Sequence, residues 1–302
     1  MLRVNDLQKE LSYYQKKFGM KTVNRFNEDG LEIVELATGL DEGSNIVPYE
    51  DNPILILKHD PKASRPYPKS AGLFHFAILV PDRKSLASTF LSLENQGVDF
   101  TGFADHLVSE SLYLQDPENN GIEIYCDRPR EEWIFENGHV CMDTIPLNLD
   151  SVLSELSQDE IAKPGLITSL KPFPRGATIG HIHLKVTNLI NSTKFYHEIL
   201  GFDLMQSIYG ASFLSVEGYH HRLALNNWQS LGGSSVKTRE AGLEHFTILV
   251  SDKSFLKDLS LKVVNTSYYT TKSNEEVLVT DPDGIKMMIR YEGNNNNSKP
   301  FN

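Results

Sequence analysis

The sequence predicts an α+β fold in which four βαβββ modules are arranged as two tandem domains. Three internal repeats in the sequence predict this arrangement of modules. A helical segment near the start of the chain recurs 182 positions later, an apolar strand recurs at an offset of 170, and an Asp-Pro turn with its following strand recurs at an offset of 165. Repeats of this kind indicate that one structural unit occurs several times along the chain.

The first repeat predicts two helices, each preceded by a strand. Residues 6–20 (DLQKELSYYQKKFGM) align without a gap with residues 188–202 (NLINSTKFYHEILGF). Both segments begin with Asp or Asn, which caps a helix, and both end near a glycine that suits a left-handed turn. We expect first strands at 2–4 and 181–186, and helices at about 6–18, 83–97, 188–200 and 252–262.

The other two repeats predict the remaining strands. Segment AGLFHFAILVPD at 71–82 aligns with AGLEHFTILVSD at 241–252, and LYLQDPENNGIEIY at 112–125 aligns with VLVTDPDGIKMMIR at 277–290. Asp-Pro followed by Asn or Gly is typical of a turn, and here the turn leads into the last strand of a module. The four modules are therefore expected at 1–62, 70–127, 177–230 and 240–292.

Two domains account for the length of 302 residues. The first is expected at 1–127 and the second at 177–292, with two modules in each. Residues 128–176 are rich in proline and hold one short helical stretch near 149–160, so we interpret them as a connector. Residues 293–302 are expected to form a disordered tail.

Composition excludes several classes of function. The chain is 40% hydrophobic and carries a formal net charge of −11, so it repels phosphate backbones and anionic lipid, and we expect neither nucleic acid nor membrane as a partner. It contains no apolar run of the roughly 18 residues that span a bilayer. Its two cysteines, Cys126 and Cys141, form no disulfide framework. These features favour a cytoplasmic protein, and a homo-oligomer is compatible with them.

Four residues are candidate ligands of a transition metal. Two histidines and one carboxylate leave open positions on a divalent metal, an arrangement suited to non-haem Fe(II) and dioxygen. Glu123 lies between two isoleucines on an expected core strand, where a carboxylate needs a partner. A strand histidine followed by apolar residues is also common as a packed core residue. The candidate ligands are His75, Glu123, His181 and His245.

Several motifs together resemble a known superfamily. They are GHIHLKVTNL…FYHEILGF, GLFHFAILVPD, LYLQDPENNGIEIYCDRPREEW and GYHHRLALNNW. The chain resembles the vicinal-oxygen-chelate superfamily of glyoxalase I, fosfomycin and bleomycin resistance proteins and extradiol dioxygenases. It is most similar to the two-domain catechol-2,3-dioxygenase branch of Firmicutes. The resemblance implies glyoxalase-like domains and places His75, Glu123 and His181 on the three positions that this family uses for its metal.

Pairing of modules decides whether these ligands meet. The first half of the chain offers only His75 and Glu123, because the counterpart of His181 falls before the first residue, through truncation or divergence. The second half offers His181 and His245, but Met288 stands where Glu123 has its counterpart. If modules two and three pair across the domain boundary, as in some members of the superfamily, one complete site results. Modules one and four then form a degenerate second site with His245 and Met288.

The resemblance also assigns catalytic roles. In extradiol dioxygenases a tyrosine precedes the last-strand glutamate by ten positions, as Tyr113 precedes Glu123 here. The second histidine of a His-His pair is the acid–base residue of the family, which corresponds to His221 in the pair His220-His221. Histidine suits this role because its unperturbed pKa lies near neutrality. Tyr113 is then expected to hydrogen-bond a substrate oxygen, although a packed strand tyrosine or an edge histidine would give the same pattern.

Other polar residues are expected to assist. His106, His220 and Asn226 are candidates for orienting a ligand or the substrate. His183 and His197 are interpreted as structural residues that face away from the site.

These observations predict an Fe(II)-dependent extradiol dioxygenase that acts on a small catechol- or hydroquinone-type aromatic with O₂. Mn, Ni or Zn are the alternative metals. One alternative function is a glyoxalase-like isomerase or thiol-conjugate lyase, but a typical glyoxalase has a second carboxylate where module three ends in LALNNW. The other alternative is a non-catalytic binding or resistance protein on the same fold.

Overall fold

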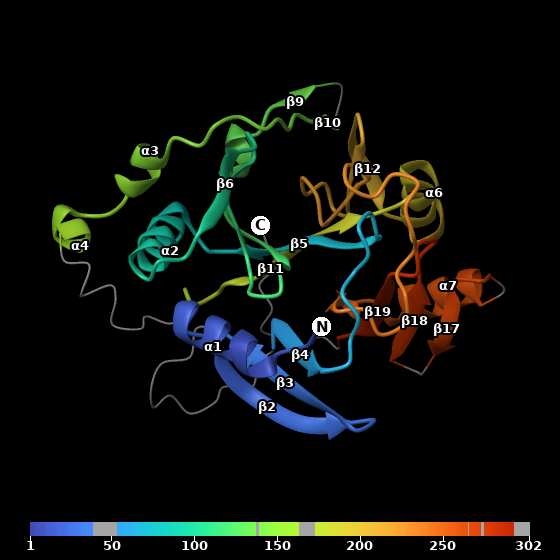
Figure 1. Cartoon of the computed structure of the whole chain (residues 1–302). Helices are drawn as coiled ribbons and strands as arrows, with labels where there is room; N and C mark the ends of the chain where they lie inside the picture. The colour runs from blue at the N-terminus through green and yellow to red at the C-terminus, as the bar shows by residue number, and fades with distance from the viewer. Residues whose placement is uncertain (39–52, 137–138, 163–172, 265, 273–274, 293–302) are drawn as a thin grey trace.

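The computed structural model describes residues 1–38, 53–136, 139–162, 173–264, 266–272 and 275–292. The expected tail at 293–302 lies outside these residues, as does part of the expected connector. Within them the four βαβββ modules are confirmed (Figure 1).

Among the described residues, modules one and two each have one helix and four strands. Module one comprises β1 (Leu2–Val4), α1 (Leu7–Lys17), β2 (Lys21–Glu28), β3 (Leu31–Ala37) and β4 (Leu55–His59). Module two comprises β5 (Gly72–Leu79), α2 (Arg83–Asn95), β6 (Phe100–Asp105), β7 (Ser109–Gln115) and β8 (Gly121–Asp127).

The segment after module two contains short elements. They are η1 (Arg130–Glu132), β9 (Phe135–Glu136), β10 (His139–Val140), α3 (Leu149–Leu153) and α4 (Gln158–Ala162). The single helical stretch expected near 149–160 is thus two helices, α3 and α4.

Modules three and four each deviate once from the simple pattern. In module three the helix ends in a π-helical turn, and in module four the first strand is split in two. Module three comprises β11 (Thr178–Lys185), α6 (Leu189–Lys194), η2 (Phe195–Ile199), β12 (Asp203–Ile208), β13 (Ala211–Ser215) and β14 (Leu223–Asn226). Module four comprises β15 (Gly242–Leu243), β16 (Phe246–Val250), α7 (Lys253–Val263), β17 (Tyr269–Lys272), β18 (Glu276–Thr280) and β19 (Lys286–Tyr291).

Side-chain caps begin the four module helices where the sequence predicts. Each cap is an Asp or Asn whose side chain accepts a hydrogen bond from a backbone N–H in the first turn, which satisfies one of the unpaired donors there. The caps are Asp6, Asp82, Asn188 and Asp252.

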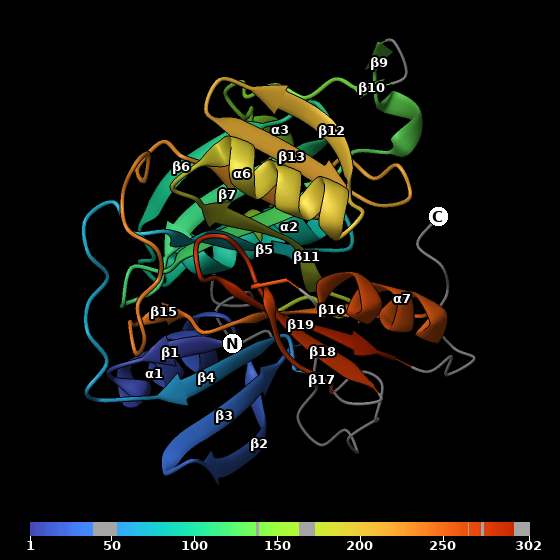
Figure 2. The ribbon, with the colours of Figure 1, turned by 90° about the vertical axis from the view of Figure 1, so that its right-hand side faces the viewer.

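Modules two and three share one sheet, as expected for pairing across the domain boundary. The eight strands follow the order β12-β13-β14-β11-β5-β8-β7-β6, and the antiparallel pairing of β11 with β5 joins the two modules. The strands of modules one and four form a five-stranded sheet, β15-β1-β4-β3-β2, and a four-stranded sheet, β16-β19-β18-β17. Figure 2 shows the shared sheet above the strands of modules one and four.

The two largest clusters of buried apolar residues lie one in each half of the chain, although the eight-stranded sheet contains strands from both halves. One buried cluster combines residues of modules one and two, such as Tyr14 and Phe90, and a second combines residues of modules three and four, such as Tyr196 and Leu259. Because each half has its own core, we propose 1–127 and 177–292 as the two domains. The shared sheet then places strands from both domains side by side.

Candidate metal centre

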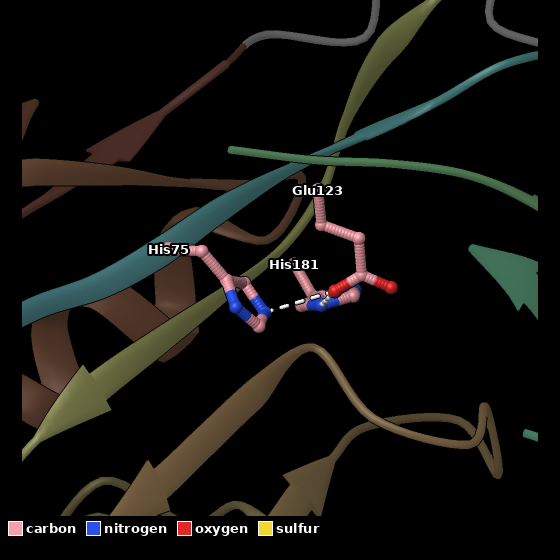
Figure 3. A group of neighbouring side chains, drawn as sticks. All are labelled: His75, Glu123 and His181. Carbon is pink, nitrogen blue, oxygen red and sulfur yellow. Dashed lines mark hydrogen bonds and ion pairs between the residues drawn. The ribbon is translucent and has the colours of Figure 1, made fainter. Parts of the chain in front are cut away.

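Three adjacent strands in the centre of the shared sheet position His75, Glu123 and His181 (Figure 3). His75 lies on β5, and β8 with Glu123 and β11 with His181 pair with β5 on its two sides. The side chains are 6%, 3% and 3% exposed. Their ligand atoms lie within 4.8 Å of one another, and among the described residues no other group of three such side chains does so. The sheet therefore brings together the three expected ligands.

The three side chains converge on one point. Oε2 of Glu123 lies 2.9 Å from Nε2 of His75 and 3.1 Å from Nε2 of His181. The contact to His75 is close but is not aligned as a hydrogen bond, so Nε2 of His75 is buried without a hydrogen-bond partner. A buried polar atom left in this state is costly unless another group binds it. The group could thus hold a metal.

The protonation state of His181 also fits a metal. Burial lowers the pKa of His181 to about 4, against the opposing effect of the Glu123 carboxylate. The imidazole is therefore neutral near pH 7, and a neutral ring nitrogen has the lone pair that a metal needs. Two histidines with one carboxylate leave open positions on a divalent ion, which suits Fe(II) among other metals.

Tyr113 and His106 form one side of the site. Tyr113 is the cross-strand partner of Glu123, and its ring centroid lies 5.7 Å from that of His75. Its hydroxyl lies 2.6 Å from Nε2 of His106, whose Nδ1 lies 3.0 Å from the carbonyl oxygen of Asp143. Because a carbonyl only accepts, Nδ1 of His106 carries a proton, and Nε2 of the neutral ring then accepts from Tyr113. Burial, aided by Glu123, raises the pKa of Tyr113, so the hydroxyl stays protonated.

His220 and His221 form the opposite side. They lie between β13 and β14, and the ring centroid of His221 is 4.2 Å from that of His181. The Nδ1 atoms of the two neighbours are 2.8 Å apart, and Nε2 of His220 lies 2.9 Å from Oδ1 of Asp127. Asp127, at the end of β8, is not predicted from the sequence, because its partner His220 is 93 residues away along the chain.

The interpretation of His183 as facing away from the site is wrong. His183 is 5% exposed, is the cross-strand partner of His75, and has its ring centroid 4.8 Å from that of His75. A strand places residues two apart on the same face, so His181 and His183 point the same way. This two-residue spacing in the sequence already indicates that His183 lies on the side of the sheet that carries His181. Asn226 lies with its Nδ2 2.9 Å from Nε2 of His183, so it orients that histidine. His197 lies outside the site, exposed on η2.

The expected degenerate second site has no matching group. His245 falls at the break between β15 and β16, and Met288 lies on β19 as the partner of Thr247. Burial lowers the pKa of His245 to about 4. With a methionine in place of the carboxylate, the described residues offer no second His and Glu combination of the kind formed by modules two and three.

A shared sheet of two βαβββ modules, with a buried His, Glu and His group where the modules meet, is the arrangement of a glyoxalase-like fold with a candidate metal site. The model of the Glyoxalase/Bleomycin resistance protein/Dioxygenase superfamily matches residues 1–124 and 178–289, and the chain belongs to this superfamily. It is 33% identical to catechol-2,3-dioxygenase of Bacillus subtilis (strain 168) over 285 residues, which cover 93% of this chain and 92% of the relative.

More distant likenesses agree on the fold. Metallothiol transferase FosB of Staphylococcus haemolyticus is 26% identical over 117 residues, which cover 37% of this chain and 81% of the relative. A candidate dioxygenase of Bacillus subtilis superposes with a TM-score of 0.61 at 14% identity, covering 96% of this chain and 83% of the other. Glyoxalase I from Zea mays superposes with a TM-score of 0.52 at 17% identity, covering 96% and 90%. No helix among the described residues is long and apolar enough to span a bilayer.

Proposed function

We propose that the protein is an extradiol ring-cleaving dioxygenase that acts on a catechol- or hydroquinone-type aromatic with Fe(II) and O₂. The observation that carries this proposal is the buried group His75, Glu123 and His181 in a chain that is 33% identical to a catechol-2,3-dioxygenase over 93% of its length. The expected alternatives to Fe(II) are Mn, Ni and Zn, because the same ligands bind each of them.

His75, Glu123 and His181 would hold the metal. When bound, Fe(II) would supply open positions for substrate oxygens and O₂ and would stabilise negative charge on oxygen. The single carboxylate balances part of the charge of a divalent ion in a site that water hardly reaches.

His221 and Tyr113 would manage protons and orientation. Burial, with the neighbouring histidines, lowers the pKa of His221 well below its usual range, so the imidazole is neutral and can accept a proton from a catechol hydroxyl. Tyr113 donates its own proton to His106, so its oxygen keeps lone pairs that can accept from a substrate hydroxyl. These two side chains approach the metal ligands from different modules and would hold the ring between them.

Aromatic side chains next to the ligands favour a planar substrate. The ring centroid of Phe74 lies 4.9 Å from that of His183 and 5.6 Å from that of Trp228. Both contacts are edge-on, and aromatic side chains in such clusters can also pack against a planar ring. A glyoxalase-like isomerase is less well supported, because Asn226 at the end of module three offers no carboxylate and its amide is bonded to His183.

Both cysteines, Cys126 and Cys141, are free thiols in the structure, which fits the reducing cytoplasm that we propose as the location. A homo-oligomeric state is part of the same proposal.

Oxygen uptake tests the proposed reaction. The protein is loaded anaerobically with Fe(II) and mixed with a panel of catechols and hydroquinones, while O₂ consumption and the absorbance of ring-fission products are followed. We expect at least one substrate to consume O₂ and to give a ring-opened product, and Glu123→Gln to abolish both signals. If the fully loaded protein consumes no oxygen with any member of the panel, the dioxygenase proposal is wrong.

A further inference from the structure

A chain of three hydrogen-bonded side chains leads from one module to the metal ligands of the shared sheet. Asp127 ends β8 of module two, and His220 and His221 belong to module three. Oδ1 of Asp127 lies 2.9 Å from Nε2 of His220, and Nδ1 of His220 lies 2.8 Å from Nδ1 of His221. His220 is fully buried and His221 is 9% exposed. Water therefore competes little with the hydrogen bonds that join Asp127, His220 and His221.

The direction of each hydrogen bond follows from the chemistry of its partners. An ionised carboxylate only accepts, so Nε2 of His220 must carry a proton. Burial lowers the pKa of His220 against the opposing effect of Asp127, which favours a neutral ring with a bare Nδ1. Nδ1 of His221 must then donate to Nδ1 of His220, and the remaining nitrogen of His221, Nε2, has no proton.

Nε2 of His221 is free for a substrate. Among the described residues, His221 makes its one hydrogen bond through Nδ1. Its ring lies against those of His181 and Phe213, with centroid distances of 4.2 and 5.3 Å. The nitrogen without a proton therefore belongs to the ring that lies beside the expected metal ligands.

We propose that Asp127 and His220 are positioning residues that fix the tautomer of His221, so that its Nε2 is always the proton acceptor. This inference rests on the proposed function, which gives His221 the acid–base role. The two residues act through His221 and do not contact the reacting atoms themselves. A neutral histidine without such partners exchanges between two tautomers, and only one of them can accept a proton at Nε2.

Asp127 also has contacts that do not involve His220. The hydroxyl of Tyr219 lies 2.9 and 3.0 Å from the two carboxylate oxygens of Asp127 and donates to them. The hydroxyl of Tyr125 lies 3.0 Å from that of Tyr219, and the guanidinium of Arg222 lies 3.8 Å from the centroid of the Tyr219 ring. Tyr219→Phe removes one donor to Asp127 and leaves the contact of Asp127 with His220. It is therefore the matched control for the tautomer measurement.

Two-bond ¹H–¹⁵N NMR spectra of metal-free protein labelled with ¹⁵N-histidine test the assignment directly, because a bare ring nitrogen and a protonated one have well separated shifts. We expect His221 to carry its proton on Nδ1 and His220 to carry its proton on Nε2, and Tyr219→Phe to leave both unchanged. Asp127→Leu should release the constraint and give His221 in a mixture of tautomers. A His221 that is protonated at Nε2 in the parent protein, or a His220 that is protonated at both nitrogens, would overturn the inference.

Kinetics of the Fe(II)-loaded enzyme supply the second measurement. For Asp127→Leu we expect kcat to fall roughly 10- to 100-fold, with metal content unchanged and KM for catechol within about twofold, the pattern of a residue that orients a catalytic group. A loss of metal that matches the loss of kcat would instead indicate a purely structural role for Asp127. A KM that rises while kcat stays constant would indicate the same.

The two measurements separate this inference from the proposed function. The NMR spectra need neither metal nor substrate, so the tautomers can be established even if no catechol is consumed. Oxygen uptake by the parent protein together with a proton on Nε2 of His221 would refute the positioning role alone. Absence of oxygen uptake with the expected tautomers would refute the dioxygenase reaction alone.

Discussion

His181 and Glu123 are both cross-strand partners of Ala77, one from each side of β5. His181 belongs to module three and Glu123 to module two, so the candidate ligand group forms where the two modules share a sheet. Ala77 is fully buried and takes no part in the apolar cluster formed by its neighbours Phe76 and Ile78. Its small side chain therefore lies on the face of the sheet that carries the ligands.

Glu123→Gln is expected to lose metal affinity. The substitution keeps the shape of the side chain but removes the only negative charge among the three ligands, and with it the compensation of a divalent cation. Met288→Leu, at the corresponding position of module four, is the matched control and should keep the metal content of the parent. Metal analysis by plasma emission after equal loading measures both. Equal metal retention by Glu123→Gln would refute its role as a ligand.

Ala77→Leu is expected to disturb the site while the fold persists. The added methylenes must enter the space between His181 and Glu123, and overpacking a buried position costs about 1–3 kcal/mol. Ala87→Leu in α2 adds the same volume to the apolar core away from the site. We expect both variants to melt at lower temperature, but only Ala77→Leu to bind metal at least roughly tenfold more weakly. Equal metal affinity of the two variants would show that Ala77 does not limit the space at the site.

The internal repeats predict much of this architecture because a repeated pattern fixes both the elements and their order. For the three candidate ligands, alternation of Glu123 with isoleucines and the pairing of modules two and three are visible in the sequence, and the resemblance to the superfamily implies the three metal positions. The contact of Asp127 with His220 cannot be predicted from the sequence, because no periodicity relates a residue at the end of β8 to a residue in another module. The same holds for Asp143, whose backbone carbonyl fixes the proton of His106 from within the expected connector.

Glu10→Gln is expected to stabilise the protein at neutral and alkaline pH. Glu10 is fully buried on α1 with neither carboxylate oxygen hydrogen-bonded among the described residues, whereas its counterpart Ser192 on α6 donates to Asp283 at 3.4 Å. Burial, followed by the nearby charges of Asp116 and Glu118, raises the pKa of Glu10 to about 9.

The sign of this effect follows from the two states. In the unfolded chain a glutamate ionises near pH 4.3, but folded Glu10 keeps its proton up to about pH 9, so the free energy of unfolding falls as pH rises between these values. Glutamine has no proton to lose, and the Tm difference between variant and parent should be near zero at pH 4 and grow toward pH 9. Thermal melts across this range measure it, with the exposed Glu94→Gln as control. A constant Tm difference at all pH values would contradict the assignment of a protonated Glu10.

His221→Ala is expected to separate binding from proton transfer. The ring lies beside His181 but outside the ligand group, and its Nδ1 is bonded to His220, so its loss should leave the metal in place. Catechol binding should also persist, because a bound metal would hold the substrate oxygens, whereas kcat should fall by roughly 10²–10⁴-fold when the proton acceptor is missing.

Steady-state oxygen uptake, catechol titration and metal analysis of the same preparation measure the three quantities. His197→Ala removes an exposed histidine outside the site and should leave all of them unchanged. Unchanged turnover in His221→Ala would show that another group accepts the proton. Loss of the metal would instead make His221 a ligand, and because its ring lies 4.2 Å from that of His181, the ligand group itself would then have to be redrawn around these two histidines.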